Sequence, residues 1–187
     1  SKDIEIFNNK DSKFEITGDR NIITNELFFV EESNNSISFK KNYENNSYIK
    51  YTYSLDENEP YFVDFSIESE GISNPELIWT IAAPETEKSK TNQEQYTGFY
   101  YQEDYSKDVD YTWDNDAFEI NEFNTDISWI AFKQQFFSTI ISAKNNNFNN
   151  DTEFKVINNE KDEYIKTMSL RTQIENGTSN YSLYFGP

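Results

Sequence analysis

Carboxylates are the most abundant reactive side chains in this sequence, and one acidic stretch has residues that could bind a cation. Asp108 and Asp110 are followed by Asp114, Asp116 and Glu119. A calcium loop needs oxygen ligands at fixed offsets and a glycine at its sharp turn, and this stretch has no glycine. The sequence therefore favours a solvated loop here. Paired acids could also hydrolyse glycosides, but no pair stands out among 34 acidic residues.

A second candidate for chemistry is the aromatic segment "YTGFYYQEDY", residues 96–105. It mixes tyrosine and phenylalanine with Gln, Glu and Asp, which are the residue types that line sugar-binding clefts. The residues we single out as a candidate cleft or partner surface are Tyr96, Phe99, Tyr100 and Tyr101. The alternative is an ordinary strand whose alternate aromatic side chains pack in a core.

Two missing residue types exclude most catalytic sites. The chain has no cysteine and no histidine, so it cannot form a thiol nucleophile, a thiolate metal site, a Ser-His-Asp triad or a histidine zinc site. We therefore predict a protein that is not an enzyme, holds no cofactor and binds no transition metal.

The net charge of -18, from 16 basic and 34 acidic residues, repels phosphate backbones and anionic lipid heads. It argues against nucleic-acid binding and peripheral membrane attachment. The opening residues lack the apolar core of a signal peptide, and no run approaches the ~20 apolar residues of a membrane helix. The sequence predicts a soluble polypeptide, and its abrupt ends suggest a piece of something larger.

Any functional side chains would be positioned by β-strands. In "SYIKYTYSL" (47–55) and "YFVDFSIES" (61–69), apolar and polar residues alternate, as in a strand with one face on the core. Similar patterns cover 76–83, 108–113, 164–174 and 181–187, with polar turns between them. No segment keeps a helical period. We predict one all-β domain, residues 1–187, built from antiparallel sheets.

The most apolar stretch, "SWIAFKQQFFSTIISA" (128–143), is interrupted by Lys133, Gln134 and Gln135. A helix would place these polar residues among apolar neighbours on more than one face. Two strands joined by a tight polar turn fit the pattern better. The sequence therefore predicts a hairpin with its turn near Gln134.

This hairpin and the chain end carry a resemblance to a known family. The residues concerned are Trp129, Ala131, Gln134, Phe136 and Phe137 in a Trp-x-Ala-x-x-Gln-x-Phe-Phe pattern, and Gly186 and Pro187 at the end. The pattern resembles a signature late in the large extracytoplasmic domain of YidC-family membrane protein insertases, and "SNYSLYFGP" is similar to that domain's closing strand. The family's opening strands and Gly-Gly turn have no match here, so we expect that the first strands are missing.

The resemblance implies a β-supersandwich of two large antiparallel sheets, similar to galactose mutarotase. It implies a place on the periplasmic side of the bacterial inner membrane, as part of a multi-pass membrane protein. It also implies a non-catalytic accessory role, with Sec translocon subunits and nascent membrane proteins as partners. The alternative is a carbohydrate-binding module on the same fold, since fold alone does not give function. Sugar epimerisation on that fold uses a histidine, which this chain lacks.

We further expect four signature residues, Trp129, Ala131, Phe136 and Phe137, to lie in the core. Gln134 should hydrogen-bond to backbone at the turn.

Overall fold

The computed structural model describes residues 11–18, 21–86, 89–103, 106–112, 118–120, 126–145, 147–148, 152–158 and 164–187. Two residues of the acidic stretch, Asp114 and Asp116, lie outside these ranges, and residues 118–120 are described by their backbone only. No helix in the described ranges has the length and apolar character needed to cross a membrane.

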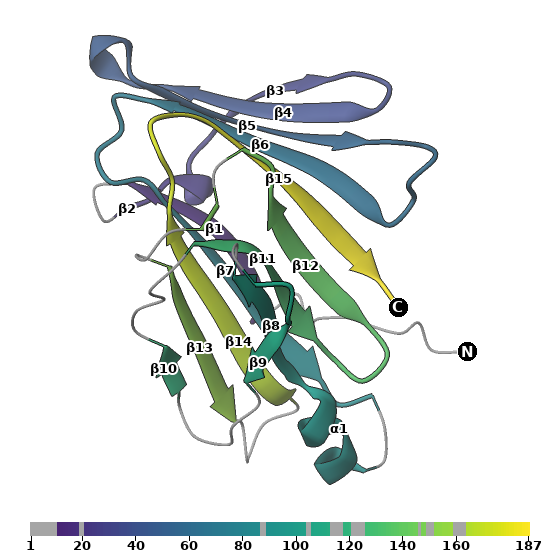
Figure 1. Ribbon diagram of the computed structural model, residues 1–187. Helices are drawn as coiled ribbons and strands as arrows, with labels where there is room; N and C mark the ends of the chain where they lie inside the picture. The colour runs from purple at the N-terminus through teal and green to yellow at the C-terminus, as the bar shows by residue number, and fades with distance from the viewer. Residues whose placement is uncertain are drawn as a thin grey trace.

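The described strands form two antiparallel sheets (Figure 1). The six-stranded sheet has the order β10 (Phe118–Ile120), β13 (Glu153–Asn158), β14 (Tyr164–Gln173), β7 (Glu76–Pro84), β1 (Lys13–Gly18), β2 (Asn21–Ile22). The nine-stranded sheet has the order β3 (Phe29–Glu32), β4 (Ser36–Asn42), β5 (Tyr48–Leu55), β6 (Phe62–Glu70), β15 (Gly177–Gly186), β12 (Ser138–Ala143), β11 (Ile127–Lys133), β8 (Gly98–Glu103), β9 (Asp110–Thr112). Two short 3-10 turns, η1 (Ile23–Asn25) and η2 (Glu44–Asn46), join strands.

The hydrophobic core lies between the sheets, and aromatic pairs show which strands face each other. Phe14 of β1 meets Phe65 of β6, with ring centroids 5.2 Å apart. Trp79 of β7 meets Phe132 of β11 at 5.2 Å. Phe154 of β13 meets Phe99 of β8 at 5.0 Å. Such tilted or edge-to-face pairs add to the free energy gained from burying the rings.

The burial follows the alternation in the sequence. Along β6, Phe65, Ile67 and Ser69 are buried while the residues between them are at least partly exposed. Along β14, Met168 and Leu170 are fully buried. Since successive side chains of a strand point to opposite faces, this period of two orients one face of each sheet to the core.

One α-helix, α1 (Lys90–Tyr96), is present where the sequence analysis placed only a polar turn. The Ser89 side chain caps its start by accepting a hydrogen bond from the Asn92 backbone N–H at 3.4 Å. The fully buried Lys166 of β14 donates from Nζ to the carbonyls of Glu94 (3.0 Å) and Thr97 (2.7 Å) at the helix end. A cation there satisfies terminal carbonyls and complements the helix dipole.

The prediction of an all-β fold with two large antiparallel sheets is confirmed. The six segments predicted as strands correspond to β5, β6, β7, β9, β14 and β15, with ends that differ by a few residues. The closer likeness to galactose mutarotase stays a prediction, as does the single domain over 1–187.

Candidate functional site

The predicted hairpin is confirmed as β11 and β12, which pair in antiparallel register from Trp129↔Ser142 to Lys133↔Ser138. Gln134 is buried at the turn, and its backbone N–H donates to the Phe137 carbonyl at 2.8 Å. The Lys133 ammonium donates to the Gln134 carbonyl at 2.6 Å. Burial lowers the pKa of Lys133 below its ordinary value. The turn is therefore held by backbone and by one lysine.

The signature residues of β11 point away from the core. Ile130 and Phe132 are fully buried between the sheets, so Trp129 and Ala131 lie on the outer face of the nine-stranded sheet. Trp129 Nε1 donates to Gln102 Oε1 at 2.9 Å, and Gln102 lies directly opposite on β8. A cross-strand hydrogen bond therefore fixes the orientation of the Trp129 side chain, which is partly exposed on this face.

Apolar side chains continue across this outer face in one row of cross-strand neighbours. The row, which we call the outer aromatic row, consists of Phe62, Tyr184, Ile140, Ala131, Tyr100 and Tyr111. The rings of Phe62 and Tyr184 lie 5.1 Å apart, and those of Tyr100 and Tyr111 lie 5.5 Å apart. Phe62 is 39% exposed and Tyr111 is 52% exposed. The row is therefore available for contact at both ends.

The core prediction for the signature residues is wrong for Phe136, which is 52% exposed in the hairpin turn. Trp129 and Phe137 are only partly buried. Ala131 is buried, but on the outer face, where Ile140 and Tyr100 flank it on the neighbouring strands. The sequence pattern gave the strands correctly but could not say which of their two faces met the second sheet.

The structure divides the four candidate cleft residues between different environments. Phe99 is fully buried and contacts Phe132 and Phe154, so it cannot contact a partner. Tyr101 stacks on Phe154 at the edge of the core. Tyr100 belongs to the outer aromatic row, and Tyr96 is 53% exposed at the end of α1. They form no single cleft, because alternate residues of β8 point to opposite faces.

A cleft that the sequence analysis missed lies between the sheets, beside β1. It has a volume of about 310 Å³. Its apolar walls are Phe14 and Trp79 from the six-stranded sheet and Tyr53, Leu183 and Phe185 from the nine-stranded sheet. Burial raises the pKa of Tyr53 well above its ordinary value. No sequence signal brings these residues together, since they come from four strands distant along the chain.

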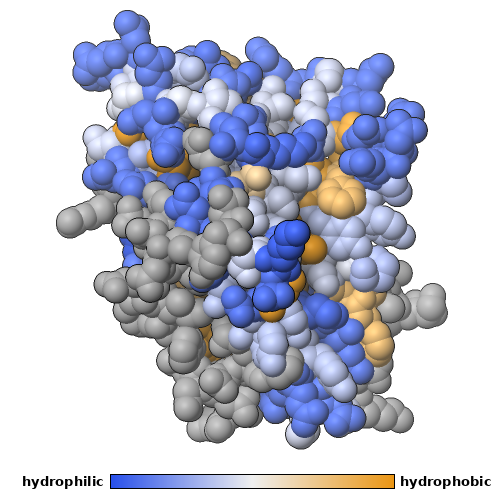
Figure 2. All heavy atoms as spheres, viewed as in Figure 1, coloured by the Kyte–Doolittle hydropathy of each residue, from blue (hydrophilic) through white to orange (hydrophobic). Residues whose placement is uncertain are grey.

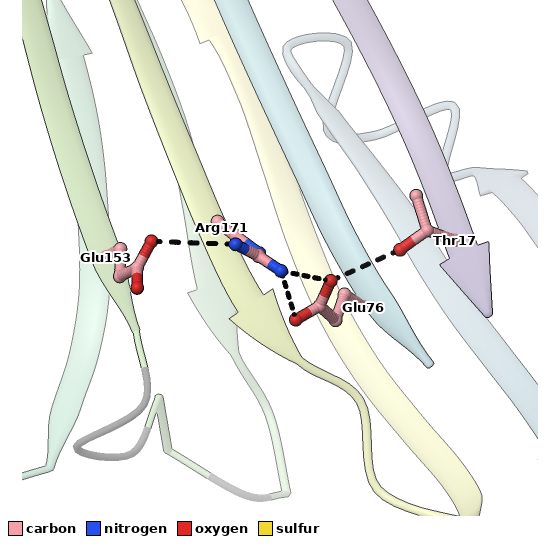
Figure 3. A network of polar contacts seen from close by, with 4 residues as sticks. All are labelled: Thr17, Glu76, Glu153 and Arg171. Atoms are coloured by element: carbon pink, nitrogen blue, oxygen red, sulfur yellow. Dashed lines mark hydrogen bonds and ion pairs between the residues drawn. The ribbon is translucent and has the colours of Figure 1, made fainter. Parts of the chain in front are cut away.

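The outer face of the six-stranded sheet carries a polar network (Figure 3). Arg171 Nη2 lies 2.8 Å from both carboxylate oxygens of Glu76, which also accepts from Thr17 Oγ1 at 3.4 Å. Arg171 Nη1 lies 3.9 Å from Glu153. Hydrogen bonding to Glu76 raises the pKa of Arg171. These contacts link β1, β7, β14 and β13 and so hold four neighbouring strands together.

Within the described residues, no three acidic side chains converge as metal ligands would. Figure 2 shows one face of the molecule, where hydrophilic residues dominate and hydrophobic ones form separate patches. Two described surfaces with aromatic side chains are candidates for binding: the outer aromatic row with Trp129, and the cleft beside β1.

Comparison with known proteins gives one informative relative. No family model matches the chain. The chain is 30% identical, over 156 residues, to the membrane protein insertase YidC of Phocaeicola vulgatus. The match covers 76% of this chain and 24% of the relative, so the chain spans about a quarter of that protein.

Among solved structures, the 4-alpha-glucanotransferase of Thermococcus litoralis is similar with a TM-score of 0.38 and 8% identity, over 94% of this chain and 27% of that one. Because this TM-score and this identity are both low, the fold is defined by the two sheets described above and not by this likeness. The predicted resemblance is confirmed by the insertase match: the chain is homologous to one part of a YidC membrane protein insertase.

Proposed function

We propose that the chain is a non-catalytic accessory domain of a YidC-type insertase, which inserts and folds membrane proteins alone or with the Sec translocon. In this proposal it lies on the periplasmic side of a bacterial inner membrane and belongs to a multi-pass protein. Residues 1–187 act as one domain. Support comes from the homology to an insertase that is about four times longer than the matched part.

The observation that carries a binding role is the outward placement of the signature hairpin. Trp129 and the half-exposed Phe136 are large apolar residues on the surface of a chain with a net charge of -18. The outer aromatic row extends this surface across strands from β6 to β9. Aromatic residues that are anchored yet exposed are enriched where proteins bind partners.

The described chemistry favours binding over catalysis. Without histidine or cysteine, an acid–base site would need carboxylates with altered proton affinity. Two acidic residues with defined neighbours, Glu76 and Glu68, lie beside Arg171 and Lys50 at 2.8 and 3.1 Å. Both carboxylates are engaged in ion pairs that join neighbouring strands, so they serve as structural partners.

We infer that nascent membrane proteins and Sec translocon subunits are the partners. Contacts should be weak and transient, because partners in one membrane are already at high effective concentration. The acidic surface should favour neutral or basic partner patches, and association should weaken as salt rises.

The test is in-cell photo-crosslinking from the full-length protein, with the photoreactive residue placed at Phe136 or Tyr111. Leu27, which is 89% exposed on the loop before β3, serves as the matched control position. We expect adducts with translocon subunits or nascent membrane proteins from the first two positions and far fewer from Leu27. Equal labelling from all three positions would remove the outer face as the binding surface.

A carbohydrate-binding role is the second candidate, and one observation favours it. Trp129 lies beside the Gln102 amide and near the Tyr100–Tyr111 pair, which combines aromatic faces with a hydrogen-bonding group. If the same crosslinking positions label only glycans and no protein partner, this second role replaces the first.

A further inference from the structure

The two sheets differ in width, and the difference lies at one side of the sandwich. Phe14 of β1 packs on Phe65 of β6, so β1 lies over β6. Beyond β6 the nine-stranded sheet continues through β5, β4 and β3, whereas the six-stranded sheet ends with the two-residue strand β2. Among the described residues, no full strand of the six-stranded sheet faces β5.

This leaves an open backbone edge on β1. On one side β1 pairs with β7 from Lys13 to Thr17. On the other side, within the described residues, β2 pairs only with Thr17 and Gly18. Among the described residues, the four from Lys13 to Ile16 therefore have no neighbouring strand on this edge. Alternate residues of an edge strand present N–H and C=O groups that can pair with another extended backbone.

The cleft described above lies beneath β1, and it extends from Tyr53 on the side of this edge to Trp79, Leu183 and Phe185 on the side of β7. Phe14 of β1 forms one wall and Tyr53 of β5 forms another. Tyr53 stacks on Phe65 at 4.8 Å, and the next residue on that face of β5, Leu55, is 58% exposed. A strand added to β1 would lie over β5, so every second side chain would enter the apolar space between the sheets.

The charges beside the cleft also restrict its occupant. The acid-rich chain places Lys13, and no acidic residue, among the residues that line the cleft. Lys13 lies at the mouth of the cleft, and its side chain shares the outer face of β1 with that of Glu15, with their charged atoms 4.0 Å apart. A neighbouring antiparallel strand with Glu across from Lys13 and Lys across from Glu15 would match both charges.

We propose that the open edge of β1 binds an extended segment of another protein as an added strand, with its alternate apolar side chains in the cleft. The segment has apolar residues at every second position and charged residues of both signs between them. The proposal rests on the proposed function only for the source of that segment, an unfolded part of a protein being inserted. It uses a different surface from the outer aromatic row.

The test uses the 187-residue chain and two peptides of identical composition. Acetyl-TVKVEVT-amide has its three valines on one face of a strand and can place Glu and Lys opposite Lys13 and Glu15. Acetyl-TVVKEVT-amide has the same residues with the alternation broken. We expect the first peptide to bind at least about tenfold more tightly, because only it fills the cleft while pairing its backbone.

Backbone amide hydrogen exchange of Lys13–Ile16, measured by NMR, reports the binding mode. Saturation with the alternating peptide should slow exchange of edge amides by at least about tenfold, as expected when an open edge becomes hydrogen-bonded. Tyr53→Ala should weaken binding, whereas Tyr111→Ala, on the outer face, should not. Tyr53→Ala also removes core contacts, so urea unfolding is used to check that this variant folds. The exchange measurement on the unsubstituted chain does not depend on this variant.

Three results would overturn the proposal. Equal affinity for the two peptides would show that alternation is not recognised. Binding without slower exchange in Lys13–Ile16 would place the peptide elsewhere. A chain lacking residues 1–10 is measured in parallel. If these amides are protected in the full chain without peptide and lose protection in the shortened one, the edge belongs to the chain's own N-terminal segment and not to a partner.

Discussion

The signature hairpin contains two phenylalanines that allow a direct test of which residues stabilise the fold. Phe132 lies on β11 with its side chain fully buried, and its ring centroid is 5.2 Å from that of Trp79 and 4.9 Å from that of Phe99. Phe136 lies four residues later in the turn and is 52% exposed. We compare Phe132→Ala with Phe136→Ala, the same chemical change in one hairpin.

The two variants should lose different amounts of unfolding free energy, because Phe132 is enclosed between the sheets whereas Phe136 is half exposed to water. Phe132→Ala removes buried apolar surface and leaves a cavity between the sheets, which together cost roughly 3–5 kcal/mol. For Phe136, full burial of such a side chain contributes about 2 kcal/mol, and about half of its surface is still in water. No closed cavity forms at the surface, so Phe136→Ala should cost about 1 kcal/mol.

Urea unfolding of both variants, followed by circular dichroism, measures the difference. In a chain of this size, a difference of about 2 kcal/mol in unfolding free energy between the variants corresponds to a difference of roughly 4–8 °C in melting temperature. Equal losses would show that Phe136 packs like a core residue and that the outward-facing hairpin is wrong. A different outcome is that the Phe136→Ala variant keeps its stability but forms fewer crosslinks from a photoreactive residue at position 111 of the full-length protein. That result would show that Phe136 acts in binding.

Three further predictions concern polar groups. Lys166→Met should cost about 2–3 kcal/mol and speed amide exchange in α1, because two helix-end carbonyls lose their buried donor; unchanged urea unfolding would contradict this. Arg171→Ala should cost no more than about 1 kcal/mol, since its side chain is 49% exposed, and a loss of more than about 2 kcal/mol would show a stronger network. Burial and the Glu26 carboxylate raise the pKa of Tyr43 from 10.0 to about 12. The folded state therefore holds this phenol proton more tightly, so the stability from Tyr43 is present below pH 10 and is lost as pH rises from 10 to 12. Tyr43→Phe should lessen that alkaline loss in urea titrations at several pH values, and an equal loss in both proteins would refute the assignment.

The strands with clear alternation were predictable, and the helix was not. In β6, Phe65 and Ile67 alternate with polar residues, which fixes both the strand and its buried face. Helix α1 is polar on all sides and has only Gln93 buried, so no apolar stripe announces it. Its stability depends on Ser89 and on Lys166, which is 72 residues distant from Glu94. Such a tertiary contact leaves no local signal.

The site was harder to predict than the fold for a similar reason. In β11, apolar residues occupy both faces: Ile130 and Phe132 point inward, while Trp129 and Ala131 point outward. Periodicity cannot assign a face when both are apolar. The cleft beside β1 depends on the sheets having unequal widths, which arises from long-range pairing. The resemblance carried by the hairpin pattern and the chain end, rather than periodicity, pointed to an insertase, and the homology of the chain to part of a YidC insertase agrees with it.

The two proposed surfaces lie on opposite faces of the same sheet, and this makes their roles separable. On β6, Phe62 faces outward in the aromatic row while Phe65 faces the core beside the cleft. On β15, Tyr184 and Leu183 divide in the same way.

If both proposals hold, an occupant of one face would not block the other, and the chain could bind a folded partner and an extended segment together. Tyr111→Ala should reduce crosslinking without changing affinity for the alternating peptide, and Tyr53→Ala should do the reverse. If either variant lost both crosslinking and peptide affinity, the two surfaces would be coupled across the nine-stranded sheet and would act as one site. Such coupling would require a movement of β6 and β15, because both strands contribute side chains to each face.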